Sequence, residues 1–488
     1  MKKKPPWYLV VARENVFAVA AQYSTVVTSL VYVWFFPTLL GSEGFGLLSL
    51  VIAVSSLWLF FTEFGIGMAA LYFIPQRHGE RAWAYFRFFE KSKWMLSALA
   101  AALLFLLAPW IALGLKNPSL SEPIKVSALL TALYSLSGFY ATVFSALRKS
   151  FYTFLTTATH FGLRAILPFI FFFAFGGFVS VLWAFVLSAA ASLTLAIALL
   201  YAKRRVLFPN FETTIEGMPK VVRRYFAYGT LVTFNYLISM FIDAPITALF
   251  LPASAIGIFR TAFSWANFPN SVFPFSSAVF VSSYARKPEK KAVMYKKTLQ
   301  YGLAFSFWAV LGIALLAPGF VKLVYGIQYA EASTLLVYLS PLTIAFTLFQ
   351  AADMLLTGTG RIDISARINF ATTVLQVLLY VTLIPVFGLM GIVASILAMK
   401  FLSAGVITAY ALRHADIPFD VQLLLKPAVA SLICLLVLSQ LLAGFESSWR
   451  ILLFFGLVAT LAYGLLLFLF RAVEPAELLK IARGAIRI

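Results

Sequence analysis

Five charged side chains lie inside long and otherwise apolar stretches of this sequence. They are Glu63, Arg164, Asp243, Arg260 and Lys400. A charge held inside a membrane costs on the order of 3 kcal/mol or more, so such residues usually pair with one another or serve a function. These five residues are therefore the candidate site, if the stretches around them cross a membrane.

Three of the five are cations, and they favour an anionic ligand. Arg260 carries a guanidinium, whose planar fork matches phosphate oxygens in a bidentate way. Arg164 and Lys400 lie near the middle of their stretches, so we predict a cationic lumen lined by all three. The alternative is structural, because an acidic neighbour or a helix C-terminus would neutralise a buried cation, and Asp243 is close enough in sequence to pair with Arg260.

The two acids, Glu63 and Asp243, are assigned to the same lumen. Glu63 precedes Gly65 and Gly67 and could carry a coupling proton, because burial favours the neutral acid. We favour the other role, in which it is the partner of a lumen cation. His160 could titrate near neutral pH, but a histidine that packs between helices is the favoured interpretation.

The composition requires a membrane around these residues. Of the 488 residues, 62% are hydrophobic and only 11% are charged, and the mean hydropathy is +0.93. A soluble protein is closer to half apolar and a quarter charged. The net charge of +20 lies in short segments between apolar stretches, which excludes a nucleic-acid surface. Cys434 is the single cysteine, so neither a disulfide within the chain nor a cysteine metal cluster can form.

Unbroken apolar runs, rather than alternating ones, predict an all-α polytopic membrane protein. We expect about fourteen spans, and most of the 38 basic residues then lie on one side, which predicts cytoplasmic N- and C-termini. The spans are 15–36, 45–74, 94–115, 125–147, 154–175, 179–202, 225–250, 256–284, 298–317, 331–356, 366–385, 389–411, 427–443 and 449–471.

An internal repeat divides the chain. The motif LLAP at Leu106–Pro109 recurs at Leu315–Pro318, and Gly44–Gly46 aligns with Ala255–Gly257. Each block has six spans, so the blocks are parallel and related by a pseudo-two-fold axis along the membrane normal. The predicted domains are a first six-helix lobe (1–202), a cytoplasmic linker (203–224), a second six-helix lobe (225–411), and two extra helices with a tail (412–488).

Several segments resemble the multidrug/oligosaccharidyl-lipid/polysaccharide (MOP) exporter superfamily, and its polysaccharide transporter branch most closely. They are GSEGFGLLSLVIAVSS, TEFGIGMAALYFIPQ, YGIQYAEASTLLVYLSPL, ADMLLTGTGRIDISARINF and LIPVFGLMGIVASILAM. The resemblance implies two lobes that flip lipid-diphosphate-linked glycans. It also implies that Arg260 matches the lumen arginine of the peptidoglycan-precursor flippase, and that Glu63 takes the acidic place of an acidic-x-Gly pattern. The first span, Val16–Phe36, contains neither the carboxylate of the drug exporters nor the interior arginines of that flippase.

We therefore predict a flippase, not an enzyme, that moves isoprenoid-diphosphate-linked oligosaccharides to the outer leaflet by alternating access. Its partners would be this substrate and membrane lipids, with no cofactor, in a monomer of the cell membrane that ion or proton gradients could drive. One alternative is a multidrug exporter of the same fold, which needs an acidic lumen. The other is a polytopic glycan polymerase or glycosyltransferase, which needs catalytic acids in a sizeable aqueous loop, and the predicted outer loops are short.

Overall fold

The computed structural model describes residues 7–67, 69–70, 74, 82–147, 149–208, 230, 243–271, 291–359, 361–445 and 448–472. Every regular element in these ranges is a helix, and eleven helical segments among them are long and apolar enough to cross a membrane. This confirms the all-α fold. Much of the predicted seventh and eighth spans and of the 203–224 linker lies outside the described residues.

The chain forms two compact units, Met1–Gly257 and Ile258–Ile488. The helices up to α10 belong to the first unit, α11 begins in the first unit and ends in the second, and the rest belong to the second. The helices are α1 (Trp7–Trp58), α2 (Phe60–Glu63), α4 (Ala82–Gly114), η1 (Pro118–Leu120), α5 (Ser121–Ala146), α6 (Ser150–Phe175), α7 (Gly177–Ala202), α8 (Arg204–Leu207), α10 (Asp243–Phe250), α11 (Ala253–Ser271), α13 (Lys291–Tyr325), η3 (Ile327–Tyr329), α14 (Ala330–Leu339), α15 (Leu342–Gly358), α16 (Ile362–Phe387), α17 (Leu389–Ala415), α18 (Gln422–Leu442) and α19 (Trp449–Leu469).

The first two predicted spans meet without a loop. Two helical segments, labelled together as α1, meet at Gly41 and end at Trp58, inside the second predicted span. The backbone of Gly41 is not helical (φ 68°, ψ 175°), and its φ lies in the region that favours glycine. The first unit also extends past the predicted linker. It does so because α10 packs against α1, and because Lys116 at the end of α4 donates a hydrogen bond to the carbonyl of Leu249 at 2.8 Å.

A close helix crossing joins α1 to the start of α11. A methyl carbon added at Gly46 would lie 1.8 Å from the carbonyl oxygen of Ala253, and one added at Gly257 would lie 2.0 Å from that of Ser42. No side chain fits at such distances, so the two backbones touch. The same offset of 211 residues relates Gly46 to Gly257 and Ser42 to Ala253. Equivalent positions of the two repeats therefore meet at this crossing.

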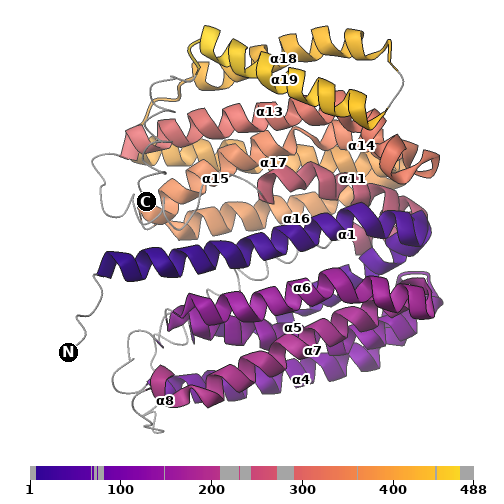
Figure 1. Cartoon of the computed structure of the whole chain (residues 1–488), viewed down its shortest axis with the longest axis vertical. Helices are drawn as coiled ribbons and strands as arrows, with labels where there is room; N and C mark the ends of the chain where they lie inside the picture. Colours follow the sequence, from indigo (N-terminus) through magenta and orange to yellow (C-terminus); the bar gives the residue numbers. More distant parts are fainter. Residues whose placement is uncertain are drawn as a thin grey trace. The chain divides into compact units, whose positions relative to one another are not determined.

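In the second unit, the two C-terminal helices pack against α13. Helices α18 and α19, drawn in yellow and orange, run alongside it (Figure 1). The hydroxyl of Tyr463 donates to the carbonyl of Ala304 at 2.9 Å, and the hydroxyl of Ser431 donates to that of Phe307 at 3.2 Å. The predicted pair of extra helices is thus present, and it is fixed to the second unit by polar as well as apolar contacts.

Candidate functional site

A break in the helix that follows α1 places the first group of buried polar residues. Phe64 has a left-handed backbone (φ 35°), and Gly65 follows with φ 74°. A left-handed residue ends the regular hydrogen-bond ladder and leaves backbone carbonyls without helical partners. The chain therefore needs another donor at Thr62 and Glu63, at a depth where water is scarce.

Lys93 of α4 supplies that donor. Its side chain is only 1% exposed, and its ammonium donates to the carbonyl of Thr62 at 2.9 Å and forms an ion pair with the Glu63 carboxylate. Glu63 keeps 29% of its side chain exposed. The hydroxyl of Ser135 on α5 also donates to the Thr62 hydroxyl at 2.7 Å. The helix break is thus held by side chains from both α4 and α5, and the buried charge of Lys93 is balanced by Glu63 at the break.

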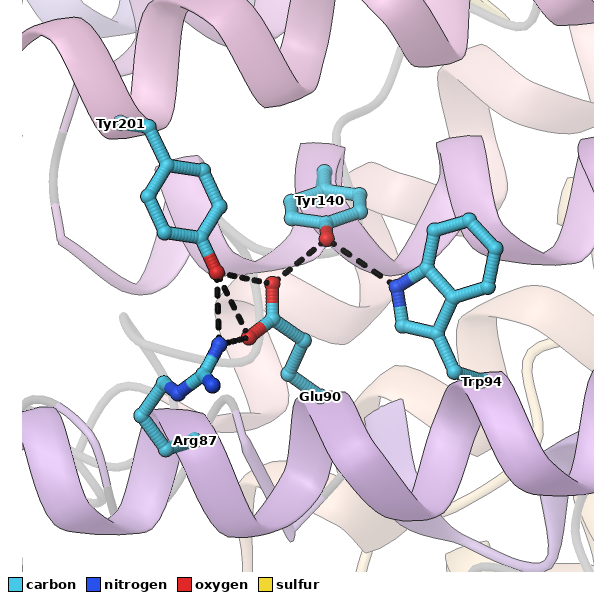
Figure 2. Close-up of polar contacts among 5 residues, drawn as sticks. All are labelled: Arg87, Glu90, Trp94, Tyr140 and Tyr201. Carbon is cyan, nitrogen blue, oxygen red and sulfur yellow. Dashed lines mark hydrogen bonds and ion pairs between the residues drawn. The ribbon is translucent and has the colours of Figure 1, made fainter.

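A second buried carboxylate lies on the same face of α4, one turn before Lys93. Glu90 is 4% exposed and joins three helices (Figure 2). It accepts a hydrogen bond from Tyr140 of α5 at 2.6 Å and from Tyr201 of α7, whose hydroxyl lies 3.0 Å from both carboxylate oxygens. Arg87 donates to Glu90 at 2.5 Å and to the Tyr201 hydroxyl at 2.7 Å. The carboxylate is therefore well satisfied, as a buried charge requires.

The Glu63–Lys93 ion pair and the Glu90 network differ in how far a ligand or water could reach them. Glu90 is enclosed and bonded by three side chains, so its function is to hold α4, α5 and α7 together. Glu63 is partly accessible, but its charge is already matched by an ammonium that solvent cannot reach. Removing the Glu63 charge would strand the Lys93 ammonium in an apolar interior, which is strongly unfavourable.

Two of the five predicted residues, Glu63 and Arg164, contact residues that were not among the candidates. Glu63 pairs with Lys93, which is not one of the three predicted lumen cations. The guanidinium carbon of Arg164 in α6 lies 4.2 Å from the ring centre of Phe185 in α7, a cation–π contact. Asp243 is buried in the first turn of α10, where its carbonyl accepts a hydrogen bond from the Thr247 hydroxyl at 2.6 Å. Half-buried positions in α11 and α17 hold the remaining two cations, Arg260 and Lys400.

Asp243 and Arg260 belong to different units, and their pairing stays a prediction. So do the assignments of Arg164, Arg260 and Lys400 to substrate binding.

Sequence reasoning missed Glu90 and Lys93. The sequence predicts a third span that begins at residue 94 and leaves both residues outside it, whereas α4 begins at Ala82. The available signal was aromatic: Trp83, Tyr85 and Phe86 make the residues before 94 as suitable for burial as those after it. A helix that starts earlier places Glu90 and Lys93 three residues apart, on one face.

The family described as polysaccharide biosynthesis protein matches residues 11–281, which is more than half of the chain. An uncharacterized membrane protein of Methanocaldococcus jannaschii is 24% identical over 375 residues, covering 71% of this chain and 73% of the relative.

Solved structures of similar fold include a lipid II flippase, MurJ, in an inward closed conformation, with a TM-score of 0.74, 15% identity, and coverage of 94% of this chain and 99% of that one. A multidrug resistance transporter of the MATE family in an inward-facing conformation has a TM-score of 0.66 and 16% identity, and the match covers 82% of this chain and 98% of that one. An outward-facing MATE transporter has a TM-score of 0.59 and 15% identity, with coverage of 83% and 95%. At these identities the likenesses show the fold alone.

Proposed function

Since the chain belongs to the polysaccharide biosynthesis protein family, in the MOP exporter superfamily, we propose that it flips lipid-diphosphate-linked oligosaccharides from the cytoplasmic to the outer leaflet. The two lobes would alternate in access, as the inward- and outward-facing conformations of the MATE transporters suggest for this fold. The sugar and diphosphate need a polar, cationic path, and the isoprenoid tail can stay in the bilayer.

The observation that supports an anionic cargo is the Lys93–Glu63 pair. Glu63 is the acid that a cation exporter would need to leave available, and here a fully buried lysine already balances it. The remaining charges deep in the spans are Arg164, Lys400 and Arg260, against Asp243 alone among the predicted acids. That balance favours a phosphate-bearing headgroup, whose oxygens accept charge-assisted hydrogen bonds from arginine and lysine.

We assign Arg260 the leading role in binding the diphosphate, with Arg164 and Lys400 assisting. Lysine offers a point charge and arginine a rigid fork, so Arg260 and Arg164 would orient the phosphates while Lys400 adds attraction. Glu63 and Asp243 stay as candidates for ion or proton coupling. We further propose that the protein acts as a monomer in the cell membrane, with both termini in the cytoplasm.

Multidrug export is the second candidate, because the MATE structures share the fold over nearly their whole length. A drug exporter would move cationic dyes and would depend on an exposed acid. The polymerase or glycosyltransferase alternative has no support, since the solved structures of this fold named above are a flippase and transporters.

The test uses the full chain in proteoliposomes loaded with a fluorescent lipid-diphosphate oligosaccharide. We compare wild type with Arg260→Ala and with Arg450→Ala, which removes an exposed arginine at the start of α19. Loss of one charge-assisted contact of 1.5–3 kcal/mol should slow flipping roughly 10- to 100-fold for Arg260→Ala. Arg450→Ala should flip at the wild-type rate.

A parallel assay replaces the lipid with a cationic fluorescent dye. Equal flipping by the Arg260→Ala variant and the wild type would remove Arg260 from the mechanism. Transport of the dye without movement of the lipid would replace the flippase with the drug exporter.

A further inference from the structure

Two basic cavities open on α4 and on α13; the first borders the Glu90 network described above, and neither is lined by a residue assigned to substrate binding. The first has a volume of about 710 Å³ and lies among α4, α5 and α7. Its cations are Arg87 and Lys91, and Trp94, Tyr140 and Tyr201 contribute aromatic walls (Figure 2 shows all of these but Lys91). Glu90 offsets one positive charge, so the first cavity is modestly cationic.

The second cavity, of about 310 Å³, is more strongly basic. Lys296 and Lys297 of α13, Lys426 of α18 and Arg471 after α19 line it, and among the residues that the structure describes the acid lining it is Asp420. All three lysines are partly buried. The carboxylate of Asp420 accepts a hydrogen bond from the backbone N–H of Gln422 at 3.2 Å, at the start of α18. A surplus of partly desolvated cations in a concave site is favourable only if an anion shares it.

The backbone at the rim of the second cavity is also strained. Arg471 has a left-handed conformation (φ 50°), which costs a residue other than glycine about 1 kcal/mol. Two lining side chains hold this turn in place: Gln300 donates to the carbonyl of Ala472 at 2.6 Å, and Lys426 donates to that of Arg471 at 3.4 Å. The surroundings therefore position an arginine where glycine would fit more easily, as functional sites often do.

The two cavities are lined by equivalent positions of α4 and α13. The offset of 209 residues that aligns Pro109 with Pro318 in the LLAP motif places Arg87 on Lys296 and Lys91 on Gln300. The same offset relates Ala84 to Val293 and Phe88 to Lys297, and all eight positions line one cavity or the other. The two cavities thus share the equivalent face of α4 and α13, with a basic residue at Arg87 and at Lys296, while their other walls come from different helices.

We propose that these repeat-related cavities bind the phosphate groups of anionic membrane lipids, with the α13–α18–α19 cavity as the stronger site. Both lie at the ends of spans that the charge distribution predicts to be cytoplasmic, where basic pockets between helices attract anionic headgroups. Tryptophan and tyrosine at the first cavity are residues that favour this interfacial depth.

The acyl chains of such a lipid have a surface to follow. On α18, Leu425, Val429, Leu432 and Leu436 are all exposed and fall on one face by their spacing of three and four residues. This face begins beside Lys426, at the cavity. A free phosphate ion would gain nothing from it, so the geometry favours a lipid phosphate over a soluble one. A lipid held there would connect the two C-terminal helices to α13.

The experiment measures lipid binding by the purified full chain with native mass spectrometry, using phosphatidylglycerol and phosphatidylcholine as probes. Wild type should retain phosphatidylglycerol preferentially, and Lys296→Gln/Lys426→Gln should weaken its binding at least tenfold, since each lost charge-assisted bond contributes about one power of ten. Lys322→Gln, an exposed lysine near the other end of α13, is the matched control and should bind as wild type does. Lys91→Gln should cause a smaller loss than the double variant, without breaking the Glu90 network.

Equal retention of phosphatidylglycerol by wild type and the double variant would overturn the proposal. The proposal would also be overturned if inorganic phosphate stabilised the protein and the protein retained phosphatidylglycerol and phosphatidylcholine equally. That result would assign the cavity to a soluble ion. The measurement needs no glycolipid substrate, so its failure is independent of a failure of the flippase assay.

Discussion

The substitution Glu63→Gln tests the buried ion pair directly. It removes the negative charge and leaves the Lys93 ammonium, with 1% of its side chain exposed, facing the carbonyl of Thr62 and a neutral amide. Removing one partner of a buried pair costs about 3–5 kcal/mol. Water can reach the Glu63 side, which is 29% exposed, so we expect the lower end, about 3 kcal/mol of unfolding free energy.

The assay is reversible unfolding of the purified protein by sodium dodecyl sulfate in mixed micelles, followed by tryptophan fluorescence. Glu122→Gln is the matched control, because Glu122 also pairs with a lysine, Lys125 three residues later in α5 at 2.6 Å, but is 77% exposed. An exposed pair contributes under about 1 kcal/mol, so this variant should unfold close to wild type.

A double variant, Glu63→Gln/Lys93→Met, separates the charge effect from loss of packing. Methionine keeps most of the lysine volume and removes the stranded ammonium, so the double variant should regain about 2 kcal/mol relative to Glu63→Gln alone. If Glu63→Gln and Glu122→Gln cost the same, or if the double variant is no more stable than Glu63→Gln, then Lys93 is not held by Glu63 as described.

Two further predictions use the same unfolding assay. Tyr140→Phe should cost about 1–3 kcal/mol, because Glu90 loses a hydrogen bond in a buried site; a cost below that range would mean that the carboxylate finds another donor. Gly46→Ala should be strongly destabilising, since the added methyl would meet a backbone oxygen at 1.8 Å, whereas Gly138→Ala, with nothing within 4 Å, should be neutral or slightly stabilising. Equal stability of these two glycine variants would contradict the close crossing.

The sequence was a good guide to the fold because a bilayer simplifies the problem. Backbone groups in hydrocarbon must be satisfied within the segment, so apolar runs of sufficient length have to be helices. The all-α class and the two C-terminal helices follow from that rule. It says little about where a helix bends, so the direct meeting of two helical segments at Gly41 and the break at Phe64 needed the structure.

The site was less predictable, and α4 shows why. Hydropathy ends a span at its charges, so Glu90 and Lys93 were placed outside it. The free-energy cost of burying these two charges is offset by groups from other segments. Tyr140 and Tyr201 donate hydrogen bonds to Glu90, and Glu63 forms an ion pair with Lys93. Contacts between residues that are 30 to 111 positions apart leave no local pattern. The contact of Arg164 with Phe185 has the same tertiary origin.

The crossing of Gly46 and Gly257 bears on how such a chain could have arisen. Where equivalent positions of two copies meet, a surface must be complementary to itself, which is the condition for a symmetric homodimer. An ancestral polypeptide of half this length, with this one glycine, would already have offered a patch that a sister molecule could bind. Gene fusion would then have joined partners that were assembled beforehand, and any later change of that glycine in one half would have to be tolerated by the unaltered backbone of the other.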